Sequence, residues 1–460
     1  MTTTTPNPNI PILHLPPSLR IISLNCWGLK FISTHRSARL LEIGRQLSLA
    51  SPTPTLVGLQ ECWTQADYLA VRSLTKSILP YGKFYFSGIF GSGLAILSKY
   101  PIEESSMYRY PLNGRPSAFY RGDWYVGKGV ACARIRMRPG KGGVVEVFCT
   151  HLHAPYAEAG GGDSYACHRV AQAWEVARLM RWAGERGHGV VGLGDFNSEP
   201  GGLGYRVVVG GAGVRDVWRV ARPESAVERK GGKVGGGEVP SSGECLRVHG
   251  ATCDSRFNTW RWSRGMRREL ERGRDHEVDP EVPDPRARRL DYVFFASPAG
   301  QRWEVENVEV GMTMRHPTLR CSLSDHFSVE TTLVRQHAGE AGSEPAMSTY
   351  MYLPIETYDE ILAMIATYNI RERKQRRLRL THFVVELFVA LGCFVAVWWS
   401  PHNFVAFLLM LLSTLGLSAG VLDGLMGGLF VGSEIRALKE FEYEVRNARE
   451  QALRSSGSNP

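Results

Sequence analysis

The chain has 460 residues, of which 43% are hydrophobic and 22% are charged. This composition excludes a wholly disordered chain and leaves room for one large domain plus a further segment. The formal net charge of +9 indicates an anionic partner, and nucleic acid, phosphoinositide and acidic membrane fit it equally well.

The N-terminal residues 1–18 are rich in Thr and Pro and lack the positive and apolar regions of a secretory signal. We expect them to be a short disordered lead-in. The nine cysteines of the chain include no CxxC and no paired spacing. They indicate reduced thiols in a cytosol-facing protein rather than a disulfide framework.

Residues 19–335 alternate short β-rich runs, such as RIISLNCW, VVEVFCTHLHA and LDYVFFA, with helix-like stretches. In the stretch HRVAQAWEVARLMRWAGE, Val170, Ala173, Trp174, Ala177 and Met180 recur at helical spacing, and burial in a core accounts for them. Alternating strands and helices with few long loops predict one α/β sandwich domain.

Residues 222–290 depart from this pattern. A Gly-rich GGKVGGGE is followed by closely mixed positive and negative charges. We expect a variable insertion that forms a solvated loop, and a lid facing the substrate is the alternative.

The segment 336–380 begins as a linker, continues as a predicted amphipathic helix (LPIETYDEILAMIATYNI) and ends in the densest basic cluster of the chain. The cluster consists of Arg371, Arg373, Lys374, Arg376, Arg377 and Arg379. It has two compatible interpretations, a membrane topology signal and the recruitment of anionic lipid headgroups.

Two apolar runs follow, 382–399 with Glu386 as its only charge and 404–422 with none. Each nearly reaches the ~20 apolar residues that cross a membrane core, and the SPHN between them indicates a turn. We therefore predict a transmembrane hairpin over 381–432. A buried hairpin of a soluble domain is the alternative, but only one highly charged helix remains downstream to cover it.

The basic cluster predicts that the near end of the hairpin faces the cytosol. A hairpin returns the chain to the side from which it entered. The enzyme-like domain and the C-terminal helix and tail, 433–460, are therefore expected to be cytosolic, on the endoplasmic reticulum or the mitochondrial outer membrane.

Several short motifs each end a strand-like run with a residue suited to phosphate or metal chemistry. These residues are Asn25, Glu61, His151, Asp195, Asn197, Asp291, Asp325 and His326. Any one such motif is more often a turn or a cap than a catalytic site. Because the ends of neighbouring strands converge in an α/β sandwich, their joint occurrence predicts one shared active site.

The chemistry of a phosphodiester suggests a role for each residue. Mg²⁺ prefers one or two carboxylates with retained waters, so Glu61 is the first candidate ligand, with a neutral oxygen from Asn25 and Asp325 as a further carboxylate. His326 with Asp291 behind it forms an oriented base that can activate water.

The remaining groups suit the developing charge on phosphorus. His151 and Asn197 are candidates to stabilise it, together with the metal ion. Asp195 is suited either to ligate the metal or to position the attacking water, and the sequence leaves both roles open.

The motifs LNCWGL, LQE, THLHA, GDFNS, RLDYVF and SDH, in that order, resemble the endonuclease/exonuclease/phosphatase superfamily. The stretches GSGLAILSKYPI and THLHAPYAEAGGGDSYACHRVAQAWEVA are similar to the neutral sphingomyelinases, including the fungal inositol phosphosphingolipid phospholipases C. The resemblance covers nearly the whole chain except the lead-in and the 222–290 insertion. It implies a DNase-I-like four-layered α/β sandwich with a C-terminal two-helix membrane anchor.

The resemblance also implies roles for residues. It implies Mg²⁺ at Glu61 with Asn25 nearby, His326 as general base, and His151 as a partner of the phosphate or the leaving group. Asp195 and Asn197 would line the same site.

Two further segments match the family in part. In GDWYVGK, the resemblance makes Lys128 a phosphate contact, and a surface lysine is the alternative. A segment likened to a P-loop holds Asp163 and His168, but it lacks GK[ST], so nucleotide binding is not expected. Family members can carry a lysine where this chain has His168. We expect Asp163 to cap the following helix.

The resemblance implies a membrane-anchored, Mg²⁺-dependent phosphodiesterase of the phospholipase C type. Its substrate would be an inositol phosphosphingolipid or sphingomyelin, its products ceramide and a phosphorylated headgroup, and its activator an anionic lipid such as phosphatidylserine. Nucleic acid is not an expected partner.

The main alternative is a nuclease of the same superfamily, which has no use for a membrane hairpin. The inositol polyphosphate phosphatases usually carry GDxNxR, which GDFNSE does not match. A catalytically dead membrane scaffold is disfavoured because every expected active-site residue is present.

Overall fold

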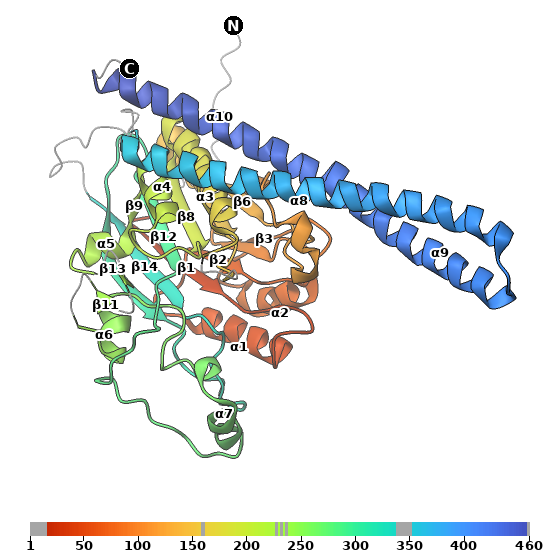
Figure 1. Ribbon diagram of the computed structural model, residues 1–460. Coiled ribbons are helices and arrows are strands. Elements are labelled where there is room, and N and C mark those ends of the chain that lie inside the picture. The colour runs from red at the N-terminus through yellow and green to blue at the C-terminus, as the bar shows by residue number, and fades with distance from the viewer. Residues whose placement is uncertain are drawn as a thin grey trace, which may run out of the picture. The chain divides into compact units, whose positions relative to one another are not determined.

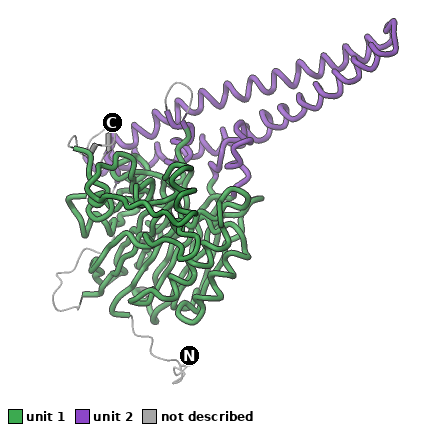
Figure 2. Tube along the Cα trace, turned by 90° about the horizontal axis from the view of Figure 1, so that it is seen from below, with its two compact units in different colours: residues 1–110, 127–156, 172–351 green, residues 111–126, 157–171, 352–460 purple. Residues whose placement is uncertain are grey.

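The computed structural model describes residues 16–157, 162–225, 229–230, 233–234, 238–336 and 352–457. The chain divides into two compact units, coloured separately in Figure 2. Unit 1 comprises Met1–Tyr110, Gly127–Tyr156 and Gln172–Met351, and unit 2 comprises Pro111–Val126, Ala157–Ala171 and Tyr352–Pro460. Most of the predicted lead-in and the linker from 337 to 351 lie outside the described residues.

Unit 1 contains two six-stranded mixed sheets (Figure 1). The first has the order β13 (Trp303–Gly311), β14 (Ser328–Arg335), β1 (Ser18–Asn25), β2 (Leu56–Gln60), β4 (Leu94–Ser98) and β3 (Tyr81–Tyr85). The second has the order β5 (Ile102–Arg109), β6 (Gly129–Arg136), β7 (Val144–His151), β8 (Gly189–Asp195), β12 (Asp291–Ala296) and β9 (Arg215–Asp216). A short separate ribbon pairs β10 (Arg229–Lys230) with β11 (Lys233–Val234).

The inner faces of the two sheets form one hydrophobic core, and helices cover their outer faces. Buried residues of the inner core include Ile21, Leu56, Ile96, Val147, Val191 and Val293. Outside the first sheet, α1 (Arg36–Leu49) and α2 (Gln65–Thr75) bury Leu40, Ile43 and Val71 in a core shared with β1, β2 and β4.

Outside the second sheet lie α3 (Ala166–Glu185) and α4 (Leu203–Ala212). Met180 of α3 lies so close to Gly192 of β8 that an added Cβ would meet its sulfur at 2.4 Å. Four residues of the predicted stripe of α3, Val170, Ala173, Ala177 and Met180, are below one-tenth exposure, whereas Trp174 is only partly buried. The four-layered α/β sandwich expected from the sequence is therefore confirmed.

The strand register brings the chemistry-bearing strand ends to one edge. β1 runs parallel to β2 with Asn25 opposite Gln60, and β7 runs parallel to β8 with His151 opposite Asp195. Asp291, at the start of β12, is paired with Asp195 across an antiparallel ladder. Residues hundreds of positions apart in the chain thus reach the same edge of the sandwich.

The stretch 222–290 is more ordered than the sequence predicts. Helix α5 (Val217–Ala221) ends just before it, and the stretch itself contains α6 (Ser242–Arg247), a short 3-10 turn (Thr259–Arg261) and α7 (Arg264–Glu271). The expectation of a solvated loop is wrong for 251–259, where Thr252, Ser255 and Thr259 are fully buried. The burial is stabilised by tertiary hydrogen bonds, such as that from Asn258 Nδ2 to the Ser324 carbonyl at 2.9 Å.

Unit 2 is built on long helices. α8 (Ile355–Ala396) is one helix of 42 residues, followed by α9 (Asn403–Leu425), a π-helical turn (Met426–Phe430) and α10 (Val431–Ser455). The predicted amphipathic helix, the basic cluster and the first apolar run are thus one element, and the boundary expected near 380 is absent. No proline interrupts α8, and its first glycine is Gly392.

Glycines on one face of α9 allow it to approach α8 closely. An added Cβ would lie 2.2 Å from Glu386 Oε2 at Gly416 and 2.7 Å from Glu386 Cβ at Gly420. Small residues spaced four positions apart are typical of tightly paired membrane helices. At the base of this pair, Asp423 forms ion pairs with Arg379 and His382.

The outward faces of the two apolar runs are exposed. Exposed side chains include Val384, Phe388, Leu391, Phe394, Phe407, Leu408, Leu412 and Leu415. By length and composition the helical stretches Ile355–Trp399 and Asn403–Ser455 are each able to cross a membrane. Their exposure argues against the alternative of a hairpin buried in a soluble core.

Unit 2 also buries a polar cluster between α8, α10 and the first turn of α3. Tyr368 donates to Glu434 Oε1 at 2.7 Å, and His168 Nε2 lies 3.0 Å from the same oxygen. Burial, reinforced by Glu434, raises the pKa of Glu372 to about 8, and burial raises the pKa of Glu434 to about 7. Burial lowers the pKa of His168 to about 4. Arg115 belongs to the same buried environment and favours the ionised carboxylates.

The segment ahead of α3 behaves as expected. Asp163 Oδ1 accepts a hydrogen bond from the backbone N–H of Tyr165 at 3.0 Å, just before the helix begins. Asp163 also forms an ion pair with Arg169. These contacts are those of a residue that stabilises the helix start.

Candidate active site

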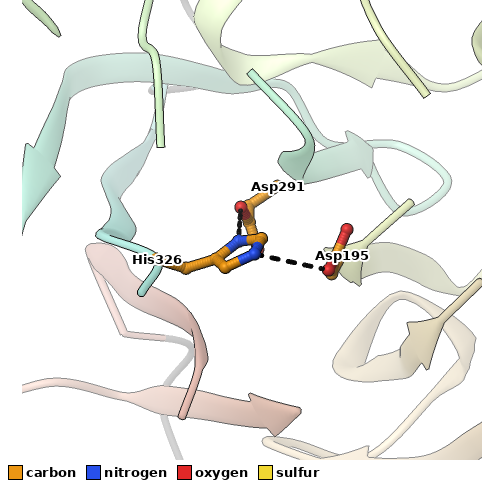
Figure 3. A group of neighbouring side chains, drawn as sticks. All are labelled: Asp195, Asp291 and His326. Carbon is orange, nitrogen blue, oxygen red and sulfur yellow. Dashed lines mark hydrogen bonds and ion pairs between the residues drawn. The ribbon is translucent and has the colours of Figure 1, made fainter. Parts of the chain in front are cut away.

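A histidine–aspartate pair lies where β12 and β14 meet at the edge. His326 Nδ1 lies 2.8 Å from Asp291 Oδ2, and both side chains are buried. Asp291 begins β12, and His326 lies two residues before β14. The Asp291 contact at Nδ1 leaves Nε2 directed towards Asp195, 4.0 Å from its Oδ2 (Figure 3).

Two further carboxylates converge on one amide. Asn25 Nδ2 donates to Glu61 Oε1 at 3.2 Å and to Asp195 Oδ2 at 3.1 Å. The Asn25 Oδ1 accepts from the N–H of Trp27 at 3.0 Å. Glu61 and His326 therefore belong to one constellation, linked through Asn25 and Asp195.

The backbone at this edge adopts uncommon conformations. Trp27, Glu61 and Asn197 have positive φ angles of 46°, 54° and 45°. Such conformations cost on the order of 1–3 kcal/mol for a residue other than glycine and persist only where surrounding structure holds them. Their concentration at one edge fits a preorganised site.

His151 and Lys128 complete one side of the site. His151 Nε2 lies 3.5 Å from Asp195 Oδ2. The Lys128 ammonium is buried and donates to the carbonyls of His151 and Leu152 at 3.3 and 3.2 Å. Lys128 is thus not the surface lysine of the alternative interpretation. Its ammonium group lies against the backbone carbonyls of His151 and Leu152, next to the site.

Asn197 and Asp325 are held by their neighbours. The Asn197 amide donates to the Leu152 carbonyl at 3.1 Å, and its backbone N–H donates to Asp195 Oδ1 at 2.9 Å. Asp325 Oδ1 accepts from Ser324 Oγ at 3.3 Å. All of the site residues predicted from the sequence therefore lie at this edge.

Comparison with known proteins agrees with this arrangement. The sequence profile of the Endonuclease/Exonuclease/phosphatase family matches residues 22–245. An inositol phosphosphingolipids phospholipase C of Schizosaccharomyces pombe is 37% identical over 94% of this chain and 95% of its own length. The protein of the same name in Saccharomyces cerevisiae is 32% identical over 94% of this chain and 90% of its own. Human sphingomyelin phosphodiesterase 2 is 31% identical over 70% and 65%. The chain belongs to the inositol phosphosphingolipid phospholipase C and neutral sphingomyelinase family.

The buried carboxyls of this family member carry shifted pKa values. Burial, and then the charge of Asp291, raise the pKa of Asp195 to about 7. Burial raises the pKa of Asp325 to about 6, and Glu61 adds to the effect. Several acidic groups crowded in one buried place repel one another unless a cation neutralises them.

The two histidines shift in opposite directions. Burial, followed by the charges of Lys128 and His326, lowers the pKa of His151 well below its usual range. Burial also opposes the charged form of His326, but Cys253 and Asp291 outweigh it and raise the pKa of His326 well above its usual range. A neutral His151 and a basic His326 suit different roles in one site.

The site can hold a metal ion. Ligand atoms of Asp195, Asp291 and His326 lie within 4.8 Å of one another. Glu61 Oε2 is also buried and has no hydrogen-bond partner among the described residues. A buried carboxylate oxygen without a partner requires compensation, which a cation supplies.

The sequence did not single out two residues of the 222–290 stretch that touch the His326–Asp291 pair. Thr252 Oγ1 donates to Asp291 Oδ2 at 2.5 Å. The backbone of Cys253 forms an isolated β-bridge with His326. No motif marks either residue, because their role arises only from the path of the insertion.

Proposed function

We propose that this protein is a Mg²⁺-dependent phosphodiesterase of the phospholipase C type that hydrolyses phosphosphingolipids, with inositol phosphosphingolipids as the first candidates. The observation that carries the proposal is the convergence of the His326–Asp291 pair with Glu61 and Asp195 around Asn25. Relatives that match 94% of the chain are named for the inositol lipids. Sphingomyelin is the second candidate because a named sphingomyelin phosphodiesterase matches 70% of the chain.

In this mechanism His326 is the general base. Asp291 Oδ2 accepts a hydrogen bond from Nδ1–H of His326, which holds the ring and leaves Nε2 to take a proton from the attacking water. Water forms a bond to phosphorus and the bond from phosphorus to the ceramide oxygen breaks. The leaving ceramide oxygen takes up a proton from solvent, and His326 later releases to solvent the proton that it removed from the attacking water. His151, buried and neutral, and the Asn197 amide face the charge that develops on the phosphate oxygens.

Glu61 and Asp195 are the proposed Mg²⁺ ligands, with Asp325 as a further carboxylate. Asn25 would add its Oδ1 as a neutral ligand, which requires its amide to turn from the arrangement in which Nδ2 donates to both carboxylates. Mg²⁺ prefers oxygen ligands, which favours this set over one that includes the His326 nitrogen. When bound, the ion supplies positive charge that neutralises the phosphate oxygens. Positive charge also lowers the pKa of neighbouring acids and bases, which returns Asp195 to its carboxylate form and His326 to a base.

The two apolar helices are proposed to anchor the protein in a membrane, with the catalytic part in the cytosol. The orientation rests on the positive residues just ahead of the first apolar run. Anionic lipids such as phosphatidylserine are the proposed activators. Four residues of the basic cluster remain exposed for them, namely Arg373, Lys374, Arg376 and Arg377.

The test uses the full-length protein in detergent with three substrates: inositol phosphosphingolipid, sphingomyelin and single-stranded DNA. We expect ceramide release that depends on Mg²⁺ and stops with chelator. Glu61→Gln should lower the rate by ~10²-fold or more because it removes a charge that holds the ion. It should also weaken Mn²⁺ binding measured directly by electron paramagnetic resonance.

Glu330→Gln is the matched control. Glu330 is also buried, but it pairs with Arg20 in the first sheet, away from the site. Its loss should leave metal binding unchanged. Cleavage of DNA with inert lipids would reverse the proposal in favour of the nuclease, which the named relatives do not favour.

A further inference from the structure

Two loops of unit 1 expose large apolar side chains to an unusual degree. In the loop 28–35, Phe31 is 94% and Ile32 68% exposed, and in the loop 86–93, Ile89 is 76% and Phe90 56% exposed. We call these four side chains the apolar tips. Singly exposed apolar residues are ordinary, whereas several in one place mark an interaction site.

The highest exposures of large apolar side chains in unit 1 are gathered in these two loops. Among its described large hydrophobic residues, the four most exposed are Phe31, Ile89, Ile32 and Phe86, and all four lie in these two loops. Leu49, at the end of α1, follows at 62%. The exposure is therefore concentrated in the two loops rather than spread evenly over the surface of unit 1.

Both loops leave the sandwich at the catalytic edge. β1 ends at Asn25 beside Gln60, so the loop 28–35 starts at this edge. β3 ends with Tyr85 opposite Leu94, while Ala95 lies opposite Leu59 near the end of β2. The loop 86–93 therefore emerges at the same edge as Glu61.

Hydrogen bonds tie the two loops to the Glu61 segment itself. The N–H of Gly28 donates to the Glu61 carbonyl at 3.0 Å, and the N–H of Cys62 donates to the Gly93 carbonyl at 3.0 Å. The second loop also reaches the segment that carries Lys128, because the N–H of Gly127 donates to the Gly91 carbonyl at 3.0 Å. The apolar tips thus flank the site.

The bases of both loops are firmly held, so the exposure does not arise from loose chain. The buried guanidinium of Arg39 donates to the carbonyls of Cys26 and Trp27 at 3.1 and 2.8 Å. In the second loop, Ser92 Oγ donates to the Tyr85 carbonyl at 2.6 Å. Rigid loops that present apolar side chains to solvent incur a hydrophobic cost that an apolar environment removes.

We propose that the apolar tips insert into the interfacial layer of a lipid bilayer and hold the catalytic edge against it. The proposal rests on the proposed function, since a phosphosphingolipid presents its scissile bond at the headgroup level, just above its hydrocarbon chains. Lys30, whose Nζ lies 4.9 Å from the centre of the Phe31 ring, adds a cation suited to anionic headgroups. Apolar residues with neighbouring basic groups are typical of surfaces that bind bilayers.

The first test is physical and does not require turnover. One additional cysteine is introduced at Phe31, Ile89 or Leu49 of the full-length protein and labelled with a fluorophore. The labelled protein is then placed in vesicles that contain doxyl-labelled lipids. Of the nine native cysteines, seven are buried and only Cys132 and Cys253 are partly exposed, so an introduced exposed thiol labels first. Leu49 is the control, because it lies near the amino end of β2, at the opposite edge of the sheet.

Labels at Phe31 and Ile89 should be quenched at least ~5-fold more by the doxyl lipids than a label at Leu49, since quenching requires contact with acyl chains. Equal quenching at all three positions would overturn the proposal. Protection of Phe31 and Ile89 that needs an added protein and not lipid would also overturn it, in favour of a protein-binding surface.

The second test measures activity. The double variant Phe31→Ser/Ile89→Ser should lose ~10-fold or more on substrate in vesicles, yet less than ~3-fold on detergent-dispersed substrate. Leu49→Ser should change neither. Equal losses on both substrate forms would contradict membrane docking. Selective quenching in a protein that releases no ceramide would reject the proposed function and leave the docking surface standing.

Discussion

At the scale of single residues, some groups of the site can be predicted from their residue type in the sequence. Others are recognised only from their contacts in the folded structure. The pair His326–Asp291 was predicted from residue types, and the two side chains lie 2.8 Å apart. Thr252 was not predicted, because threonine in a charged, Gly-rich stretch carries no signal. Its hydrogen bond to Asp291 makes it a positioning residue for the proposed base.

Replacing His326 by Ala should lower kcat by at least ~10²-fold, since a general base contributes on the order of 10²–10⁴ to the rate. Because His326 is not a proposed metal ligand, Mn²⁺ binding should stay near the wild-type value. The measurement is steady-state ceramide release together with Mn²⁺ titration. Unchanged turnover would remove His326 from the role of base.

Thr252→Val should lower kcat by ~10-fold, as expected when a hydrogen bond to a buried charged group is lost. The pH dependence of kcat should shift as well, because Asp291 then holds the imidazole less firmly. Thr331→Val is the control: its hydroxyl is also buried and donates to the Asn307 carbonyl at 2.8 Å, far along β14. Similar losses in both variants would point to stability rather than positioning.

At the scale of elements, α8 unites parts that the sequence shows as three. Its first third contacts α10 through buried polar groups, and its middle carries the basic cluster. Its last third packs against the glycines of α9. A helix of 42 residues is about 63 Å long at 1.5 Å per residue. It can therefore join a region rich in buried polar groups to an apolar hairpin without a hinge.

The carboxyls of Glu372 and Glu434 should make the stability of unit 2 fall as the pH rises. Both lie outside the two apolar runs, and burial raises their pKa from 4.5 to about 8 and about 7. Between pH 4.5 and about pH 8 the folded state binds more protons than the unfolded state. The stability that the two protonated carboxyls contribute is therefore present at pH 4.5 and is lost as the pH approaches 8.

Glu372→Gln keeps the shape and removes this titration. In detergent at pH 8 it should raise the unfolding temperature by on the order of 5 °C, with little change at pH 5. Glu356→Gln, in the exposed first turn of α8, should change neither value. A variant that is destabilised at both pH values would show that Glu372 is ionised and needed in that form.

At the scale of the whole molecule, the tertiary structure divides the basic cluster into two classes. Arg371 is paired with Glu372 and Arg379 with Asp423. Arg373, Lys374, Arg376 and Arg377 are exposed. Only the four exposed residues are available to lipid headgroups. Recruitment of anionic lipid therefore depends on these four residues, whereas the paired Arg371 and Arg379 can contribute only to the topology signal.

Changing these four exposed residues to Gln should reduce activation by phosphatidylserine, because each basic residue near a charged surface contributes ~1 kcal/mol. The measurement is the ratio of activity on vesicles with and without the anionic lipid, at two salt concentrations. A matched variant neutralises the four exposed arginines Arg264, Arg268, Arg272 and Arg274 in and after α7. Equal effects of both variants would reduce the role of the cluster to general charge.

The sequence by itself determined what depends on local order and residue chemistry. Strand and helix periodicity predicted the α/β sandwich, two apolar runs predicted the hairpin, and strand-end motifs predicted which residues share a site, including Asn25 and Glu61. These features follow from repeated spacing and from the few residue types that bind phosphate and metal. The order of the motifs carried the resemblance to a family, and that resemblance implied the activity and the roles of the site residues.

Only the tertiary structure decided what depends on contacts between distant segments. The path of the 222–290 stretch places Thr252 on Asp291, and the course of the chain buries Glu372 beside Glu434. The same holds for the apolar tips, because their exposure and their shared edge come from strand register and not from local pattern. Burial and proximity are properties of the folded chain, since residues far apart in sequence become neighbours only when the sheets and helices assemble.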